Sequence, residues 1–530
     1  MLIQGKIQYR SLGRSILLGG LLILTSLILL GQTPNFWSGI WDNEKLLAFD
    51  HVRLIEQGAG ISNINLARIP SIFPDYILAW LSQLSGSDIR TQYLFYIVVQ
   101  TCLQLSLSSW ILRIITQASW LQCLAVIGGL SYLMGLASPA WAANHSLAAL
   151  PLNHGGNLVM VLTLTGFCLQ LVRSPKAQPY ASLLGITFFL ATLSNRILIL
   201  QVAIPAFLLF AFKRGSDRTL YTNIARNVAI STFAGLALSK IAIKTGCTPP
   251  MTWQLPDLAI HLANLFALQS NQVGIGFPIL FNIVICTYWC WRSRDQAVQS
   301  YGFLAATGAA LVILVYPLIF SNQGHGDSVL RYLFGIIFTA PITIGILGVR
   351  SLKKSSAFCT IALWVCATLL AINMISQTEV FASTSRFAWS ILDWENPYSK
   401  FIEENLFEGD AVLTNYESGD DQELSARSLK AGSNWRRHAS QIANGDANPW
   451  DQGKSEFYMN QVTKELRNYN SLLIRPQDQK TAETWYGIPE KKVFDKHLNV
   501  ELWIYGEVGR QRISNRLKAG LRGPFEVECS

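Results

Sequence analysis

Acidic side chains are concentrated in one short stretch of a chain that otherwise carries few of them. The acids of residues 41–76 are Asp42, Glu44, Asp50, Glu56 and Asp75. Between Asp88 and Asp217 the chain contains no Asp or Glu. A carboxylate can take or orient a proton during a reaction, so general-base chemistry is the first function that this cluster suggests. Apolar runs flank the stretch, and carboxylates beside a bilayer are costly, so we expect these acids to be functional.

The segment around Asp50 has the pattern of an amphipathic helix. One side of residues 44–57 is formed by Leu47, Leu54 and Ile55, with Ala48 and His51 beside them. Asp50 and Arg53, three residues apart, meet on another side, and Gly58 ends the pattern. We expect this helix to lie flat at a membrane surface, with Asp50 toward the water-filled side of a cleft. The alternative interpretations are a structural Asp50–Arg53 pair and, for Asp42 and Glu44, a solvated helix start.

Three arginines stand where they could meet an anion. Arg68 precedes Pro70, Arg196 lies in a tight turn between two apolar runs, and Arg331 follows Asp327. Arg196 and Arg331 could instead be interfacial anchors whose side chains reach toward water.

Histidine and cysteine spacing indicates no metal site or disulfide framework. His145 and His154 lie in a polar loop after the third apolar run and match no zinc pattern, so we interpret them as hydrogen-bonding loop residues. Most of the cysteines lie inside apolar runs, without paired spacing.

The composition is that of a membrane protein with many spans. Of 530 residues, 50% are hydrophobic and only 14% are charged. Apolar runs of spanning length occur near residues 14–31, 92–114, 119–137, 156–172, 180–195, 197–212, 226–244, 273–290, 301–320, 331–349 and 357–376. We therefore expect an α-helical polytopic membrane domain in residues 1–376, with about 11 transmembrane helices. Residues 32–91 would form its first outer loop, and the first run is interpreted as an anchor because it lacks a clear cleavage site.

Basic residues predict the orientation of this domain. With a cytoplasmic N-terminus, the cytoplasmic loops would carry Arg113, Arg173, Lys176, Lys213, Arg214, Arg218, Arg226, Arg292, Arg294, Arg350, Lys353 and Lys354. An odd number of spans then places the acidic loop and the C-terminal tail outside the cytoplasm, in a protein of the plasma (inner) membrane. The net charge of +9 partly reflects this bias, and no motif indicates a nucleic-acid partner.

Residues 385–530 are polar and predict a soluble extracytoplasmic α/β domain. Residues 411–414, 471–474 and 500–505 have the composition of strands. Residues 419–424 predict a helix that is capped by Asp420 or Asp421. The acids of residues 417–423 are interpreted as this cap and a solvated surface, with substrate contact as the alternative.

Taken together, the acidic first loop, the multi-span core and the outer C-terminal domain resemble the GT-C superfamily of membrane glycosyltransferases, which use polyprenyl-phosphate sugars. The pair Asp42-x-Glu44 followed by Asp50 looks like that family's first outer loop, which carries an essential acid near a flat juxtamembrane helix. Arg331-Tyr332 is similar to an Arg-Tyr often seen at a late outer helix end. An Asn separates the two acids that are commonly adjacent in the family, so which acid is catalytic stays open.

The resemblance implies transfer of a sugar from a polyprenyl-phosphate donor to an extracytoplasmic glycan, lipid or protein acceptor. Asp50 is the first candidate for the catalytic carboxylate, followed by Asp42 and Glu44. The candidates for substrate binding are Arg68, Asp75, His154, Arg196, Arg331 and Tyr332. The arginines suit a lipid phosphate, and Asp75 would orient an arginine or the acceptor. The resemblance leaves a divalent metal open, since some members use one and others do not, and it implies no other cofactor.

Two other functions would also need many helices. A lipid or solute transporter usually places ionisable groups at mid-membrane, and the long stretch after Asp88 has almost none there. A non-catalytic scaffold for polysaccharide or lipid assembly is the second alternative.

The orientation leads to the first prediction. A cysteine placed at Ser433 should react with a membrane-impermeant thiol reagent in intact cells, because residues 385–530 are expected outside the cytoplasm. Reaction only after lysis would overturn this topology.

Overall fold

The structure is a computed structural model of the 530-residue chain. It describes residues 17–29, 48–49, 52, 55, 72–86, 89–137, 155–174, 178–213, 217–242, 273–319, 335, 339–354, 361, 405, 411–414, 434–437, 469–474, 476, 479–480, 483, 487–496 and 500–512.

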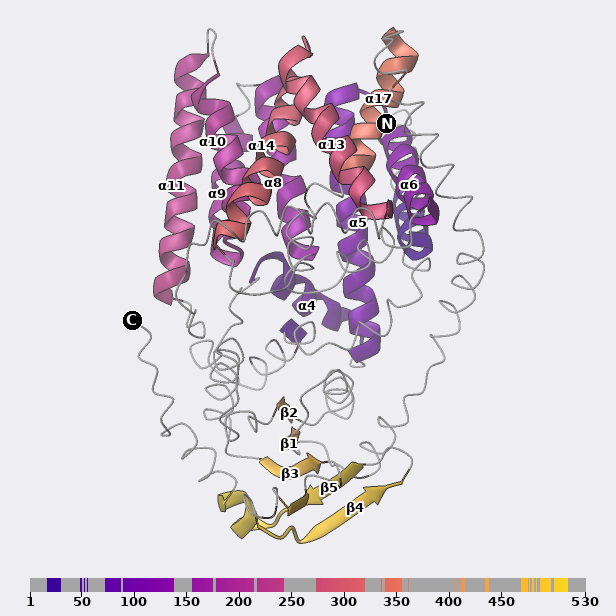
Figure 1. The fold of residues 1–530 in the computed structure, drawn as a ribbon, viewed down its shortest axis with the longest axis vertical. Coiled ribbons are helices and arrows are strands. Elements are labelled where there is room, and N and C mark those ends of the chain that lie inside the picture. Colours follow the sequence, from indigo (N-terminus) through magenta and orange to yellow (C-terminus); the bar gives the residue numbers. More distant parts are fainter. Residues whose placement is uncertain are drawn as a thin grey trace, which may run out of the picture.

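Helices make up the larger part of the described chain (Figure 1). In chain order they are η2 (Ile72–Tyr76), α4 (Ile77–Ser82), η3 (Gln83–Ser85), α5 (Ile89–Thr116), α6 (Trp120–Ala137), α8 (Gly155–Arg173), α9 (Gln178–Ser194), η4 (Ile199–Ala203), α10 (Ile204–Ala211), α11 (Arg218–Ala242), α13 (Val273–Arg292), α14 (Gln296–Ile319) and α17 (Ala340–Lys354). The apolar runs predicted between residues 92 and 320 coincide with these helices, and the run at 197–212 corresponds to η4 and α10 together.

Helix bounds and apolar runs differ where charged residues continue a helix. The helix α11 begins at Arg218, eight residues before the predicted run, because its first two turns are polar but still helical. Three described helices are long and apolar enough to cross a membrane, and several shorter apolar helices accompany them. The predicted run at 331–349 is helical in α17 from Ala340 onward. The run at 357–376 falls outside the described residues apart from residue 361, so the total of about 11 spans stays a prediction.

Contacts between helices show which of them run in the same direction. Ring contact between Trp110 and Phe167 at 5.5 Å, one near each C-terminal end, makes α5 and α8 parallel. The bond from Asn282 Nδ2 to Thr339 Oγ1 and the contact of Cys286 with Thr343 make α13 and α17 parallel. Short connections reverse the chain between α5 and α6, α8 and α9, and α13 and α14. The bundle is therefore built from two antiparallel sets of helices.

One end of the bundle collects basic residues. Arg113, Arg173 and Arg292 lie in the last turns of α5, α8 and α13. Nearby, the Arg350 guanidinium of α17 binds the Asp295 carboxylate between α13 and α14 at 2.5 Å. The positive-inside rule predicts that this end faces the cytoplasm.

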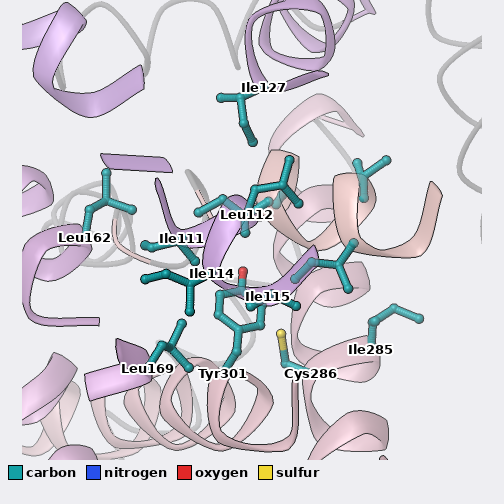
Figure 2. Packing of buried hydrophobic residues seen from close by; sticks show 14 of the residues in the cluster. Ile111, Leu112, Ile114, Ile115, Ile127, Leu162, Leu169, Ile285, Cys286 and Tyr301 are labelled. Atoms are coloured by element: carbon teal, nitrogen blue, oxygen red, sulfur yellow. The ribbon is translucent and has the colours of Figure 1, made fainter. Parts of the chain in front are cut away.

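The core of the bundle is apolar toward this basic end. Ile111, Leu112 and Ile115 of α5 pack with Ile127 of α6 and Leu169 of α8 (Figure 2). A buried polar network adds direct links between α13, α14 and α17, in which Asn282 and the Tyr301 hydroxyl both bind Thr339. Such interhelical hydrogen bonds are one of the forces that hold membrane helices together.

The C-terminal part forms a mixed five-stranded sheet at the end of the bundle where α4 lies (Figure 1). Its strands are β1 (Ala411–Thr414), β2 (Asn434–Arg437), β3 (Tyr469–Ile474), β4 (Lys491–Asp495) and β5 (Val500–Ile504), in the spatial order β2-β1-β3-β5-β4. The strand β1 is parallel to β2 and β3, whereas β5 is antiparallel to β3 and β4. The predicted strands are thus confirmed as β1, β3 and β5, and the predicted helix at 419–424 lies outside the described residues.

Close packing of α9 against α11 generates the second prediction. A Cβ at Gly235 would stand 2.5 Å from the Phe189 carbonyl oxygen, whereas nothing lies within 4 Å of one at Gly129. We expect Gly235→Ala to lower the free energy of unfolding by about 1–3 kcal/mol through overpacking. The matched Gly129→Ala should leave it unchanged or raise it by about 0.5–1 kcal/mol, because Ala favours helix. The thermal midpoints of the detergent-solubilised variants measure both effects, and equal midpoints would contradict this packing.

Candidate functional site

The short segment η2 carries Asp75 into the protein at the end of the bundle opposite the basic residues. The Phe73 amide donates a hydrogen bond to Ser194 Oγ at 2.9 Å, which fastens η2 to the last turn of α9. Ser194 Oγ in turn donates to the Leu190 carbonyl oxygen at 2.8 Å. Asp75, two residues further on, is only 2% exposed. Asp75 thus lies directly before the short apolar helix α4.

The Asp75 carboxylate is held by two other helices. The Tyr96 hydroxyl of α5 donates a hydrogen bond to Asp75 Oδ1. The carboxylate also lies against Gly156 in the first turn of α8, where a Cβ would stand 2.9 Å from Asp75 Cγ. Amide groups in a first helical turn have no partner within the helix, and the helix dipole favours an anion there. Both neighbours therefore offset the cost of burying this carboxylate.

The residue before Asp50 packs directly on this site. The Phe49 ring lies 5.4 Å from the Tyr93 ring and 5.7 Å from the Tyr96 ring. Phe49 is buried together with Ala48 and Val52, whereas Ile55 is 38% exposed. Among the described residues of this segment, the side that faces the protein is thus that of Ala48, Phe49 and Val52. The apolar pattern predicted the side of Ile55 instead. The other residues of the predicted helix, including Leu47 and Leu54, lie outside the described part.

A pair of amides continues the site along α8. Asn157 Nδ2 donates to Gln201 Oε1 of η4 at 2.8 Å, and both side chains are buried. Gly308 of α14 lets the Gln201 backbone approach closely, since a Cβ there would stand 3.2 Å from the Gln201 carbonyl carbon. The π-helical turn η4 therefore also contacts the first turn of α8, in addition to η2 and α5.

Arg196 lies at the same end as Asp75 and is exposed. The predicted turn at residues 194–196 is confirmed: the Asn195 side chain accepts a hydrogen bond from the Ile197 amide, and Ser194 contacts η2. The Arg196 guanidinium makes no ion pair with any residue that the structure describes. An exposed cation at this boundary is available to an anion.

The structure places two of the predicted site residues, Asp75 and Arg196. The remaining candidates, which lie outside the described residues, are Asp42, Glu44, Asp50, Arg68, His154, Arg331 and Tyr332. Two of these candidates have a described neighbour in sequence: Phe49 precedes Asp50, and Gly155, the first residue of α8, follows His154. Gly335, four residues after Arg331, packs against Val161 of α8, where a Cβ would stand 3.2 Å from Val161 Cγ1.

Sequence analysis missed the polar residues on the buried side of α5. The buried polar side chains at helical spacing are Tyr93, Tyr96, Gln100, Gln104 and Ser108. Their regular spacing of three and four residues inside a predicted span was the available signal. No three His, Cys, Asp or Glu side chains gather into a potential metal site within the described ranges.

Comparisons with known proteins identify the class of fold. No protein-family model and no curated protein matches this chain in sequence. In three dimensions the chain has a fold similar to that of a solved structure, over nearly the whole length of both chains.

One solved structure with this fold is ArnT from Cupriavidus metallidurans bound to undecaprenyl phosphate. The match has 11% sequence identity and a TM-score of 0.50, and it covers 94% of this chain and 99% of that one. The described apolar helices of spanning length indicate an integral membrane protein.

The buried carboxylate generates the third prediction. We expect Asp75→Leu to lower the free energy of unfolding by about 1–3 kcal/mol, because it leaves the buried Tyr96 hydroxyl without this acceptor. Asp75→Asn keeps an acceptor oxygen of the same shape and should be destabilised less. Thermal unfolding of the purified full-length variants provides the comparison, and a leucine variant as stable as the asparagine variant would contradict it.

Proposed function

We propose that this chain is a membrane glycosyltransferase that moves a sugar from a polyprenyl-phosphate donor to an extracytoplasmic acceptor. The observation that carries the proposal is the match over nearly the whole of both chains to a structure that holds undecaprenyl phosphate. The position of Asp75, Arg196 and Phe49, the residue before Asp50, at one end of the bundle supports it.

The proposed site lies at the end away from Arg113, Arg292 and Arg350. If that basic end faces the cytoplasm, the site faces outward, where the lipid head group and a polar acceptor can meet. The sheet lies at this same end (Figure 1) and would be close to the acceptor.

The proposed catalytic carboxylate is Asp50, with Asp42 and Glu44 as the next candidates. A general base must reach the acceptor, and Asp75 is poorly suited to this because it is buried and already accepts the Tyr96 hydroxyl. In the proposed site Asp75 therefore serves to orient its surroundings. The position of Phe49 supports a place for the Asp50 segment beside it.

The proposed phosphate ligands are Arg68, Arg196 and Arg331, with Tyr332 and His154 as further substrate contacts. The planar guanidinium can bind two phosphate oxygens at once and remains charged at all relevant pH values. The exposed Arg196 supports this role. The first turn of α8 supplies further amide groups at the same end.

The alternative functions lack a comparable observation. An ion-coupled transporter would need ionisable groups near the middle of the helices. Within the described helices of the bundle, the buried ionisable carboxylate is that of Asp75, at one end. A non-catalytic scaffold remains the competing hypothesis, and it predicts complex formation without a product.

The fourth prediction tests the base. The product is defined as the glycosylated molecule that mass spectrometry finds in cells with the wild-type chain and not in cells lacking it. Asp50→Asn should lower its rate of formation by about 10²- to 10⁴-fold, as expected for loss of a general base. Expression and undecaprenyl phosphate binding should stay near wild type.

Glu56→Gln, in the same loop, is the matched control and should keep the rate. If Asp42→Asn or Glu44→Gln abolishes product formation and Asp50→Asn does not, the base is that other acid of the loop. Full activity of all three candidate variants would refute the glycosyltransferase proposal.

The fifth prediction concerns the phosphate. Arg196→Ala and Arg331→Ala should each weaken binding of radiolabelled undecaprenyl phosphate by about tenfold, because a charge-assisted hydrogen bond contributes about 1.5–3 kcal/mol. Arg173→Ala removes an exposed arginine at the opposite end of the bundle and is the control. Equal affinities for all three variants would argue against a phosphate site at this end.

A further inference from the structure

Tyr96 joins the two parts of the chain that carry the proposed acidic groups. Its ring packs edge-to-face on Phe49 at 5.7 Å, and its hydroxyl donates to Asp75 Oδ1. The residue has no exposed surface. Tyr96 is therefore held both at its ring and at its hydroxyl.

We propose that Tyr96 is the positioning residue of the transfer site. Its hydroxyl sets the orientation of the Asp75 carboxylate, and its ring fixes the first-loop helix at the residue before Asp50. The proposal rests on the proposed glycosyltransferase function. Tyr96 itself contacts neither donor nor acceptor and acts through these two partners.

The neighbouring Tyr93 allows the two roles of Tyr96, ring packing and hydrogen bonding to Asp75, to be tested separately. Both rings contact Phe49, and both side chains are buried. A phenylalanine at either position would retain the packing on Phe49. The hydroxyl of Tyr96 has the further task of binding a carboxylate, and hydrogen bonds to charged groups are stronger than neutral ones.

Asp75 has little freedom to compensate for the loss of this bond. On one side Gly156 leaves just enough space for the carboxylate, and on the other Phe73 is anchored to Ser194. Without the Tyr96 hydroxyl, the carboxylate would turn toward the first-turn amides of α8 or toward water. The groups of the site that Asp75 orients would then be misplaced, and small misplacements reduce rates strongly.

The test uses the full-length protein in three variants: Tyr96→Phe, Tyr96→Leu and the control Tyr93→Phe. Product formation is measured as defined above, beside Asp50→Asn. Undecaprenyl phosphate binding and the thermal midpoint report on the fold and the donor site. The rate of tryptic cleavage after Arg53 and Arg68 reports on the first loop independently of activity.

We expect Tyr96→Phe to lower product formation about tenfold to a hundredfold, with donor binding within about twofold of wild type. Tryptic cleavage should be unchanged in Tyr96→Phe, which keeps the ring, and several-fold faster in Tyr96→Leu. Tyr93→Phe should match wild type in every measurement.

Three results would overturn the proposal in different ways. If Asp50→Asn abolishes product and Tyr96→Phe keeps it, the positioning role fails and the glycosyltransferase function stands. If both keep product, the proposed function fails and this proposal with it. If product formation, donor binding and the thermal midpoint of Tyr96→Phe all fall together, the role of Tyr96 is structural only. The same conclusion holds if Tyr93→Phe lowers product formation as much as Tyr96→Phe does.

Discussion

The buried carboxylate of Asp75 constrains everything around it. An ionised group removed from water costs several kcal/mol unless it is compensated by partners. Here the compensation comes from α5 through the Tyr96 hydroxyl and from α8 through its first turn at Gly156. The anchor of Phe73 on Ser194 adds α9. The segment of Asp75 therefore contacts three helices, α5, α8 and α9, at this end of the bundle.

The polarity of α5 divides the bundle into two halves. Toward the end with Asp75, its interior side carries Tyr96, Gln100 and Gln104, whereas toward the basic end it carries Ile111 and Leu112. The apolar half packs into a close core (Figure 2), which makes it a rigid support. The polar half joins amide and hydroxyl groups from α8 and η4, as in the Asn157–Gln201 pair. Sites held by packed elements keep their geometry better than sites on loops alone.

Much of the architecture could be predicted from sequence, and the exceptions share a physical reason. Long apolar runs predict helices because the bilayer requires them, and the three central strands β1, β3 and β5 have the apolar composition of buried strands. The missed strands β2 and β4 are the two edges of the sheet, where polar residues such as Lys491 are usual. Asp75 and Arg196 were predicted as site residues and lie at one end. Tyr96 and Asn157 were missed, because a polar residue within an apolar run has meaning only once its neighbouring helix is known.

The central claim is that a lipid phosphate binds at the end of the bundle that holds Asp75 and Arg196. The most direct measurement is an electron cryomicroscopy map of the full-length protein in lipid nanodiscs with added undecaprenyl phosphate. The proposed function predicts phosphate density at this end, beside the first outer loop, and its loss in the Arg196→Ala, Arg331→Ala double variant. Phosphate density confined to the basic end near Arg113 and Arg350, or none at saturating lipid, would contradict it.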